Sequence, residues 1–127
     1  MKGLRKTIAV LTLGACASLG MSFTPAAAHH GWRWAETEES EVTGAIKSVQ
    51  LGNPHGIVIF VVDGEEWTAE VGQPWRNEQA GLTPELLAAG VTMTIHGHRA
   101  LDKTKKVIKA ERVIIDGKSY NLYPDRD

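Results

Sequence analysis

Residues 57–71 read IVIFVVDGEEWTAEV, and this stretch decides the fold class. The first six residues form a β-branched run that is apolar on both parities, which is typical of a central strand. Asp63-Gly64 is the strongest hairpin signal in the chain, and the residues after it alternate between apolar and polar. The stretch therefore predicts a β-hairpin. The side chains expected in the core are Ile57, Ile59, Val61, Trp67 and Ala69.

The strand that precedes this hairpin, residues 42–51, carries a break in its apolar pattern. Val42, Gly44 and Ile46 share one parity, whereas Val49 and Leu51 share the other. A β-bulge or a sharp bend near residues 47–48 would reconcile the two halves. The next segment, Asn53-Pro54-His55-Gly56, is a turn cluster, so we expect a tight loop between the first two strands.

A short helix is expected after the hairpin, followed by two more strands. Residues 72–81 have the composition of a loop, and Thr83 can cap a helix that ends at Gly90. Residues 91–98 alternate cleanly and predict a half-buried strand. A basic connection, residues 101–106, leads to the last strand, residues 107–115. The expected anchors on this side of the chain are Val91, Met93 and Ile95 in the core and Tyr120, Leu122 and Tyr123 in the tail.

This order of elements predicts an all-β fold with one short helix. Three strands, a helix and two strands, with a bent first strand, match the five-stranded oligonucleotide/oligosaccharide-binding (OB) barrel. A closed barrel has no free edges and lets about 100 residues share one core. A bent β-sandwich is the alternative. The expected organisation is a signal over residues 1–28, a polar arm over 29–41 that docks by Trp32 and Trp34, and an OB-like barrel domain over 42–127.

Residues 1–28 have the composition of a secretory signal, with a basic start, an acid-free apolar run and Ala26-Ala27-Ala28 at the end. We expect cleavage after Ala28, which would leave 99 of the 127 residues in a bacterial periplasm or outside the cell. Leu13-Gly14-Ala15-Cys16 also resembles a lipobox, so a lipid anchor at Cys16 is the alternative. No stretch of the mature chain has the length and apolarity of a membrane span.

The mature chain would be acidic and free of thiols. The signal holds three of the 14 basic residues and none of the 15 acidic ones, so the remaining net charge is −4 with neutral histidines. An acidic chain repels polyanions, and we therefore expect no nucleic-acid partner. Cys16 is the only cysteine. There is also no Gly-x-Ser-x-Gly, phosphate loop or His-Glu-x-x-His motif, and we do not expect an enzyme.

The five histidines all lie in the expected mature chain and are its candidate metal ligands: His29, His30, His55, His96 and His98. After cleavage at Ala28, His29 would offer its α-amine and its imidazole together, a chelate that suits Cu(II). His96 and His98 share one face of their strand and form a second imidazole pair. The alternatives are a terminus without a ligand role for His29-His30 and a solvated strand face for His96 and His98.

Four residues are candidates for ligand binding because OB barrels use their loops and strand faces as a cleft. They are His55, Trp75, His96 and His98. Trp75, placed in a loop between Pro74 and Arg76, is the candidate for an exposed aromatic contact, whereas Trp67 alternates with core residues. His55 also has a structural alternative, a hydrogen bond to the backbone of its loop.

Several short pieces of the sequence together resemble a family of small exported bacterial proteins of unknown function. These pieces are Ala28-His29-His30, Thr43-Gly44-Ala45-Ile46, Asn53-Pro54-His55, the strand at Trp67, the segment from Gly81-Leu82 to Gly90, and Gly97. The general plan also resembles periplasmic OB-fold proteins, for which the resemblance implies ligand binding rather than catalysis. Neither resemblance supplies a catalytic residue, and fold analogy alone does not assign function.

The function expected from the sequence is that of an exported small binding protein without catalytic activity. It would hold a small ligand or a periplasmic protein partner in an OB-type cleft and would need no cofactor. The alternative is a periplasmic protein that binds copper or another transition metal through its histidines and its mature N-terminus.

Overall fold

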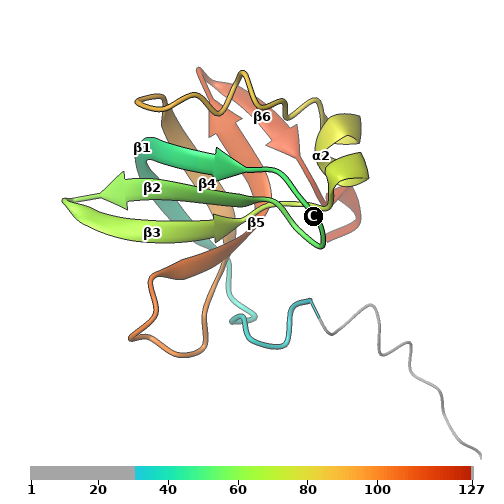
Figure 1. The fold of residues 1–127 in the computed structure, drawn as a ribbon. Helices are drawn as coiled ribbons and strands as arrows, with labels where there is room; N and C mark the ends of the chain where they lie inside the picture. Colours follow the sequence, from blue (N-terminus) through green and yellow to red (C-terminus); the bar gives the residue numbers. More distant parts are fainter. Residues whose placement is uncertain (1–30, 127) are drawn as a thin grey trace, which may run out of the picture.

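The computed structural model describes residues 31–126. In this part of the chain, four antiparallel strand pairings and one parallel pairing close a barrel (Figure 1). The strands follow the order β3-β2-β1-β4-β5-β6, and a parallel pairing of β3 with β5 closes the first five into a ring. This confirms the OB-like barrel with its helix between the third and fourth strands. The elements are β1 Ser40–Gln50, β2 Ile57–Val62, β3 Glu65–Glu70, α2 Pro74–Ala80, β4 Thr92–Arg99, β5 Val107–Ile115, β6 Lys118–Asn121 and the 3-10 turn η1 Pro124–Arg126.

The expectations for the first 30 residues lie outside the described part of the chain. They are the secretory signal with its cleavage after Ala28, the lipobox at Cys16, and the ligands His29 and His30. Within residues 31–126, no helix has the length and apolarity that crossing a membrane requires.

The β2–β3 hairpin forms as predicted, but its register corrects the expected core. Asp63 and Gly64 both adopt positive φ angles, as a two-residue hairpin turn requires, and they set Phe60 opposite Trp67. Directly opposed residues share one face of a sheet, so the buried Trp67 brings Phe60 into the core with it. The prediction that Ile57, Ile59 and Val61 lie in the core is wrong for this reason. These residues face outward and are only partly buried, and Val58 and Phe60 lie in the core instead.

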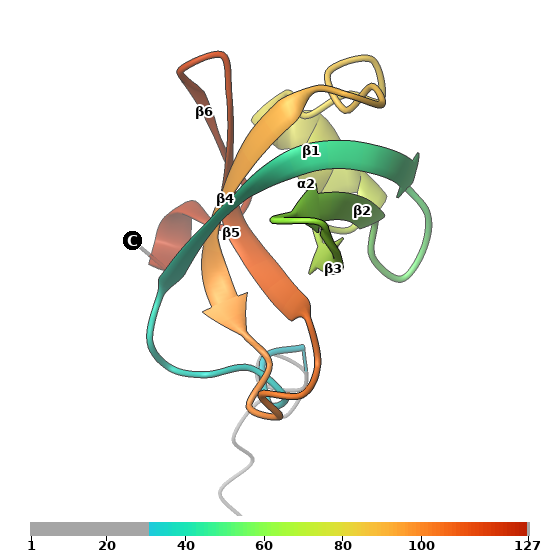
Figure 2. The ribbon, with the colours of Figure 1, turned by 90° about the vertical axis from the view of Figure 1, so that its left-hand side faces the viewer.

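The break in the apolar pattern of β1 is a β-bulge, as predicted. The pairing of β1 with β2 shifts register between Ile46 and Ser48, which leaves Lys47 as the extra residue and turns Val49 toward the core. Figure 2 shows β1 as a long curved strand that runs across the barrel and pairs with both β2 and β4. Gly44 lies at the crossing, where a Cβ atom would overlap the carbonyl oxygen of Val61. Glycine at this position therefore permits the close approach of β1 and β2.

The helix lies earlier in the chain than predicted. α2 begins at Pro74 and ends before Gly81, whose φ of 80° lets its N–H and that of Leu82 bond the last carbonyls. At the other end of the helix, the buried Asn77 side chain bonds back to the residue before its first turn. It donates to the Gly72 carbonyl and accepts from the Gly72 N–H, both at 2.8 Å. The predicted helix at Thr83–Gly90 is a series of turns instead. Its end is held by β1, since the Gly90 N–H donates to the Ile46 carbonyl at 2.7 Å.

The rest of the predicted core is confirmed on β3 and β4. Trp67, Ala69, Met93 and Ile95 are buried, and Tyr120 and Leu122 anchor the tail as expected. Val91, which we expected in the core, is only partly buried at the edge of the cluster. The core is completed from β5 by Ile108, Ala110, Val113 and Ile115.

The outer face of β4 and β5 is covered by both ends of the described chain. The arm pairs with the barrel where Ala35 forms a bridge with Ala100, and Figures 1 and 2 both place it beside the β4–β5 loop. A turn at residues 31–34 separates the two indoles that we expected to share one face. Trp32 packs on His98 of β4, whereas Trp34 lines a separate hollow beside Leu101.

Candidate functional site

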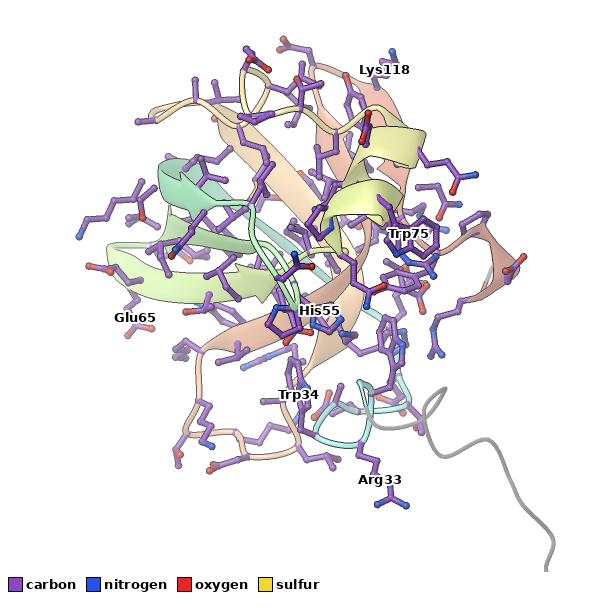
Figure 3. All side chains as sticks on the ribbon, turned by 45° about the vertical axis from the view of Figure 1, so that its right-hand side comes forward. Arg33, Trp34, His55, Glu65, Trp75 and Lys118 are labelled. Atoms are coloured by element: carbon purple, nitrogen blue, oxygen red, sulfur yellow. The ribbon has the colours of Figure 1, made fainter. Side chains whose placement is uncertain are left out.

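A cleft of about 270 Å³ opens where the β1–β2 loop meets the outer face of β2 and β3. His55 lies on this loop, and Figure 3 shows it on the same side of the molecule as Trp75. The Asn53–Pro54 peptide bond of the loop is cis. Four of the seven residues that line the cleft have polar side chains, and the lining consists of Gln50, Gly52, Asn53, Pro54, His55, Ile57 and Glu70. The structure thus places the predicted ligand-binding residue His55 in a cleft.

The back of this cleft is an ion pair that the sheet register creates. Glu70 of β3 and Lys109 of β5 are direct partners in the parallel pairing that closes the barrel. Their side chains meet on the outer face, with Lys109 Nζ 2.5 Å from Glu70 Oε1. The same carboxylate oxygen lies 3.4 Å from Nδ1 of His55. Lys109 is 1% exposed, so the pair sits in a partly dry environment where its charges interact strongly.

The surroundings of His55 favour its neutral imidazole. Burial lowers the pKa of His55 below its ordinary value of 6.5, and the positive charge of Lys109 lowers it further, against the opposing effect of Glu70. The tautomer with its proton on Nδ1 directs that N–H at the Glu70 carboxylate and leaves a lone pair on Nε2. A carboxylate that accepts from Nδ1 orients an imidazole and strengthens Nε2 as an acceptor or a metal ligand.

Aromatic side chains from both ends of the described chain cover the buried lysine. Lys109 Nζ lies 4.9 Å from the ring centre of Trp32 and 6.0 Å from that of Tyr123, within the range of cation–π attraction. Tyr123 packs against Trp32 edge to face at 5.0 Å. Burial of Tyr123 raises the pKa of its hydroxyl above the ordinary value of 10.0. The cover keeps water from the Lys109 side of the Glu70 ion pair.

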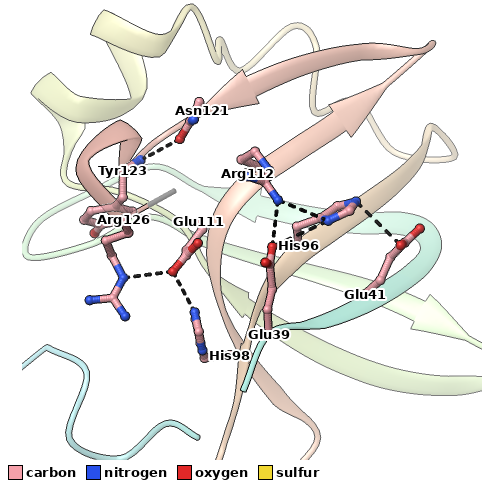
Figure 4. A network of polar contacts seen from close by, with 9 residues as sticks. All are labelled: Glu39, Glu41, His96, His98, Glu111, Arg112, Asn121, Tyr123 and Arg126. Carbon is pink, nitrogen blue, oxygen red and sulfur yellow. Dashed lines mark hydrogen bonds and ion pairs between the residues drawn. The ribbon is translucent and has the colours of Figure 1, made fainter. Parts of the chain in front are cut away.

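His98 is buried beside Lys109 and belongs to a different polar group (Figure 4). Its Nε2 lies 2.6 Å from Glu111 Oε1, which also accepts from Arg126 Nε at 2.8 Å. Trp32 covers the imidazole edge to face at 5.4 Å. The predicted exposure of His98 on a solvated or ligand-binding strand face is therefore wrong: the arm and the tail close over it.

His96 faces outward from the same strand but does not meet His98. It lies 3.5 Å from Glu39 and 3.7 Å from Glu41, and Arg112 also binds Glu39 at 2.8 Å (Figure 4). The two imidazoles predicted as a pair thus have separate partners. Within residues 31–126, no three His, Cys, Asp or Glu side chains are arranged as ligands for a metal ion.

Trp75 is exposed as predicted, although it lies on α2 rather than in a loop. It is 53% exposed and borders a groove of about 370 Å³ that is distinct from the His55 cleft. The Arg76 guanidinium stacks on its ring at 4.5 Å, and its indole Nε1 donates to Gln73 Oε1 at 2.8 Å. The structure therefore holds this exposed indole in a fixed orientation.

Glu70, Lys109 and Glu111 were missed by the sequence analysis, although they form the buried polar groups around His55 and His98. The available signal was composition: Lys109 and Glu111 interrupt strand 107–115, which is otherwise apolar apart from Arg112. Charged residues are almost never fully buried unless they are paired, so two of them in a central strand point to partners elsewhere. Only the β3–β5 register identifies Glu70 as one of those partners.

Comparisons with known proteins identify a family but no function. No curated protein matches the chain. Among solved structures, apo TiaS, a tRNA agmatidine synthetase, is similar with 14% identity and a TM-score of 0.45 over 61% of this chain and 18% of that one. A ZRD-deleted mutant of TiaS in complex with agmatine is similar with 13% identity and a TM-score of 0.45 over 67% of this chain and 26% of that one.

This chain therefore spans about a fifth to a quarter of the TiaS chains that it matches. The family model, in contrast, matches residues 17–109 and includes the whole His55 cleft. On this match, the chain belongs to DUF6152, a family of unknown function.

Proposed function

We propose that this protein binds a small, uncharged polar molecule in the cleft at His55, without transforming it. The observation that carries the proposal is the chain of contacts from Lys109 through Glu70 to His55 at the back of the cleft. It holds one imidazole neutral and oriented, with Nε2 as an acceptor. Fixed polar groups of this kind in a concave site are what ligand recognition requires.

The lining of the cleft supports a neutral ligand. The carboxylate of Glu70 is balanced by Lys109, and the other polar side chains of the lining are the amides of Gln50 and Asn53. Such a site matches a molecule with one donor for His55 Nε2 and acceptors for the amides, such as a lactam or a cyclic amide.

Titration with nicotinamide, uracil and cyclo(glycylglycine), followed by amide NMR spectra of the mature chain, would test this proposal. We expect at least one probe to shift resonances of residues 50–57 and Glu70, and the His55→Ala variant to lose these shifts. His96→Ala is the matched control, because His96 is outside the cleft and should leave binding unchanged. Shifts that persist in His55→Ala, or no response to any of the probes at millimolar concentration, would refute the proposal.

Copper binding is the second candidate, and one contact favours it. Gly31 lies against the same ion pair, since a Cβ atom there would be 3.5 Å from Lys109 Nζ. His29 and His30 immediately precede Gly31 in the sequence. A chain cleaved after Ala28 would therefore begin two residues before Gly31, which lies against the Lys109–Glu70 ion pair behind His55. We propose that His29, with its α-amine, and His55 would supply the nitrogen ligands that Cu(II) favours.

Protein whose mass shows a start at His29 should be titrated with Cu(II) beside protein that carries one extra residue before His29. We expect the extension to weaken binding at least about tenfold, or about 1.4 kcal/mol, because it removes the amine chelate. His55→Ala should weaken binding as well, while His96→Ala should not. Affinity no better than millimolar for the native terminus, or no effect of the extension, would exclude this candidate and leave the neutral-ligand proposal unaffected.

A further inference from the structure

We infer that the groove at Trp75 is a second binding site and that its ligand is an uncharged saccharide. The inference is independent of the His55 cleft, because the two sites have no lining residue in common. The groove lies between α2 and the C-terminal segment that follows β6. Its volume is about 370 Å³, and its main lining residues are Trp75, Arg76, Gln79, Asn121, Pro124 and Asp125.

The indole of Trp75 is presented as a flat platform. Its side chain projects from α2 in Figure 3, and more than half of its surface is exposed. The Arg76 guanidinium stacks on the ring at 4.5 Å, while the bond from Nε1 to Gln73 fixes the ring edge. Burial of so large an apolar ring by a ligand is favourable, and the fixed orientation lowers the entropic cost of that contact.

Arg76 supports the platform, and one of its donor groups is already bonded within the protein. Its Nη1 donates to the Leu122 carbonyl at 2.9 Å, and its guanidinium lies between the rings of Trp75 and Tyr123, 4.2 Å from the latter. Asp125 adds a negative charge to the same groove. These contacts disfavour phosphate and carboxylate ligands and leave the groove close to neutral.

The polar groups around the platform match a polyol. Gln79 and Asp125 are exposed, and together with Asn121 they place amide and carboxylate groups beside the indole. Hydroxyl groups can both donate and accept, so a sugar can satisfy carboxylate and amide groups at once. The apolar C–H face of a pyranose is the part of the molecule that packs on an aromatic ring. An indole flanked by Asn, Gln and Asp side chains is thus complementary to a pyranose on both its apolar and its polar surfaces.

The four tryptophans give a direct test, because each contributes one indole N–H signal to an NMR spectrum. The probes are cellobiose, maltose and N,N′-diacetylchitobiose, added to the mature chain up to high millimolar concentration. Trp75→Phe assigns the Trp75 signal. We expect at least one disaccharide to shift this signal while the signals of Trp34 and Trp67 stay in place.

Variants then separate stacking from a non-specific effect. Trp75→Ala should weaken binding at least about tenfold, Trp75→Phe should keep part of the affinity, and Gln79→Ala and Asp125→Ala should each weaken it severalfold. Leu101→Ala is the matched control, since it removes an equally exposed apolar side chain elsewhere and should leave the affinity unchanged. The inference is overturned if none of the disaccharides moves the Trp75 signal, or if Trp75→Ala binds as well as the parent chain.

Discussion

The buried ion pair between Lys109 and Glu70 provides the most direct test of the site. Lys109→Met removes the charge and keeps much of the volume of a side chain that is 1% exposed. The Glu70 carboxylate, whose side chain is 18% exposed, would then lack its countercharge. Removal of one partner from a buried ion pair costs about 3–5 kcal/mol. Because Glu70 keeps some contact with water, we expect a value near the lower limit, about 3 kcal/mol.

The same substitution should change the titration of His55. The positive charge of Lys109 lowers the pKa of His55, while the negative charge of Glu70 raises it. Without the lysine, only the carboxylate remains of this pair, so the pKa of His55 should rise. Denaturant unfolding measures the stability, and the pH dependence of the His55 ring proton in NMR spectra measures the pKa.

A double variant isolates the cost of the unpaired charge. Glu70→Gln combined with Lys109→Met removes both ions of this pair, so it should be more stable than Lys109→Met alone. Three results together would refute the reasoning: a loss below about 1 kcal/mol for Lys109→Met, an unchanged pKa of His55, and no gain in the double variant. These results would mean that Glu70 is solvated and that no buried ion pair lies behind His55 in the cleft.

Three further predictions test the barrel and the site. Phe60→Ala should lower the free energy of unfolding by about 3–5 kcal/mol, whereas Ile59→Ala should lower it by only about 1–2 kcal/mol because the Ile59 side chain stays partly in water. Equal losses of the two variants in denaturant unfolding would contradict the observed register. Gly97→Ala should cost about 1–3 kcal/mol by the same measurement, since its Cβ would overlap the Lys109 carbonyl oxygen, and an unchanged stability would exclude this close approach. The pKa of His55 is lowered in the folded state, so the unfolded chain takes up the proton first as the pH falls below 6.5, and the parent chain loses stability there. His55→Gln should lose less stability over the same pH range. Identical pH profiles of stability for the two chains would show that the imidazole is not shielded.

The hairpin shows how much of the fold local sequence contained. Asp63-Gly64 predicted a two-residue turn, and such a turn fixes every pair of the hairpin, including Phe60 opposite Trp67. The run 57–62 is apolar on both faces, so its own pattern could not say which side is buried. Which alternate residues of β2 face the core follows from the turn and the alternation of β3 together. The core residues of β2 could therefore not be predicted correctly from β2 alone.

The helix shows a case in which local signals were ambiguous. Two neighbouring segments each have a proline near the start and a glycine after the end, at Pro74 and Gly81 and at Pro84 and Gly90. Only the first becomes α-helical, because Asn77 closes its start while β1 takes the backbone groups at the end of the second. Hydrogen bonds to distant strands decided between two segments with similar capping residues.

The sequence by itself determined the order of the five barrel strands, the bulge in β1, the hairpin turn and the exposure of Trp75, because each depends on turn chemistry or periodicity within a few residues. It did not indicate β6. The polar groups behind the cleft depended on the tertiary structure. Glu70 and Lys109 are 39 residues apart, and they become neighbours only when β3 pairs with β5. His96 and His98 share one strand face, yet the arm and the tail bury one and leave the other among exposed carboxylates. Side-chain neighbours across a closed barrel follow from its register and its covering segments, and no local pattern in the chain encodes either.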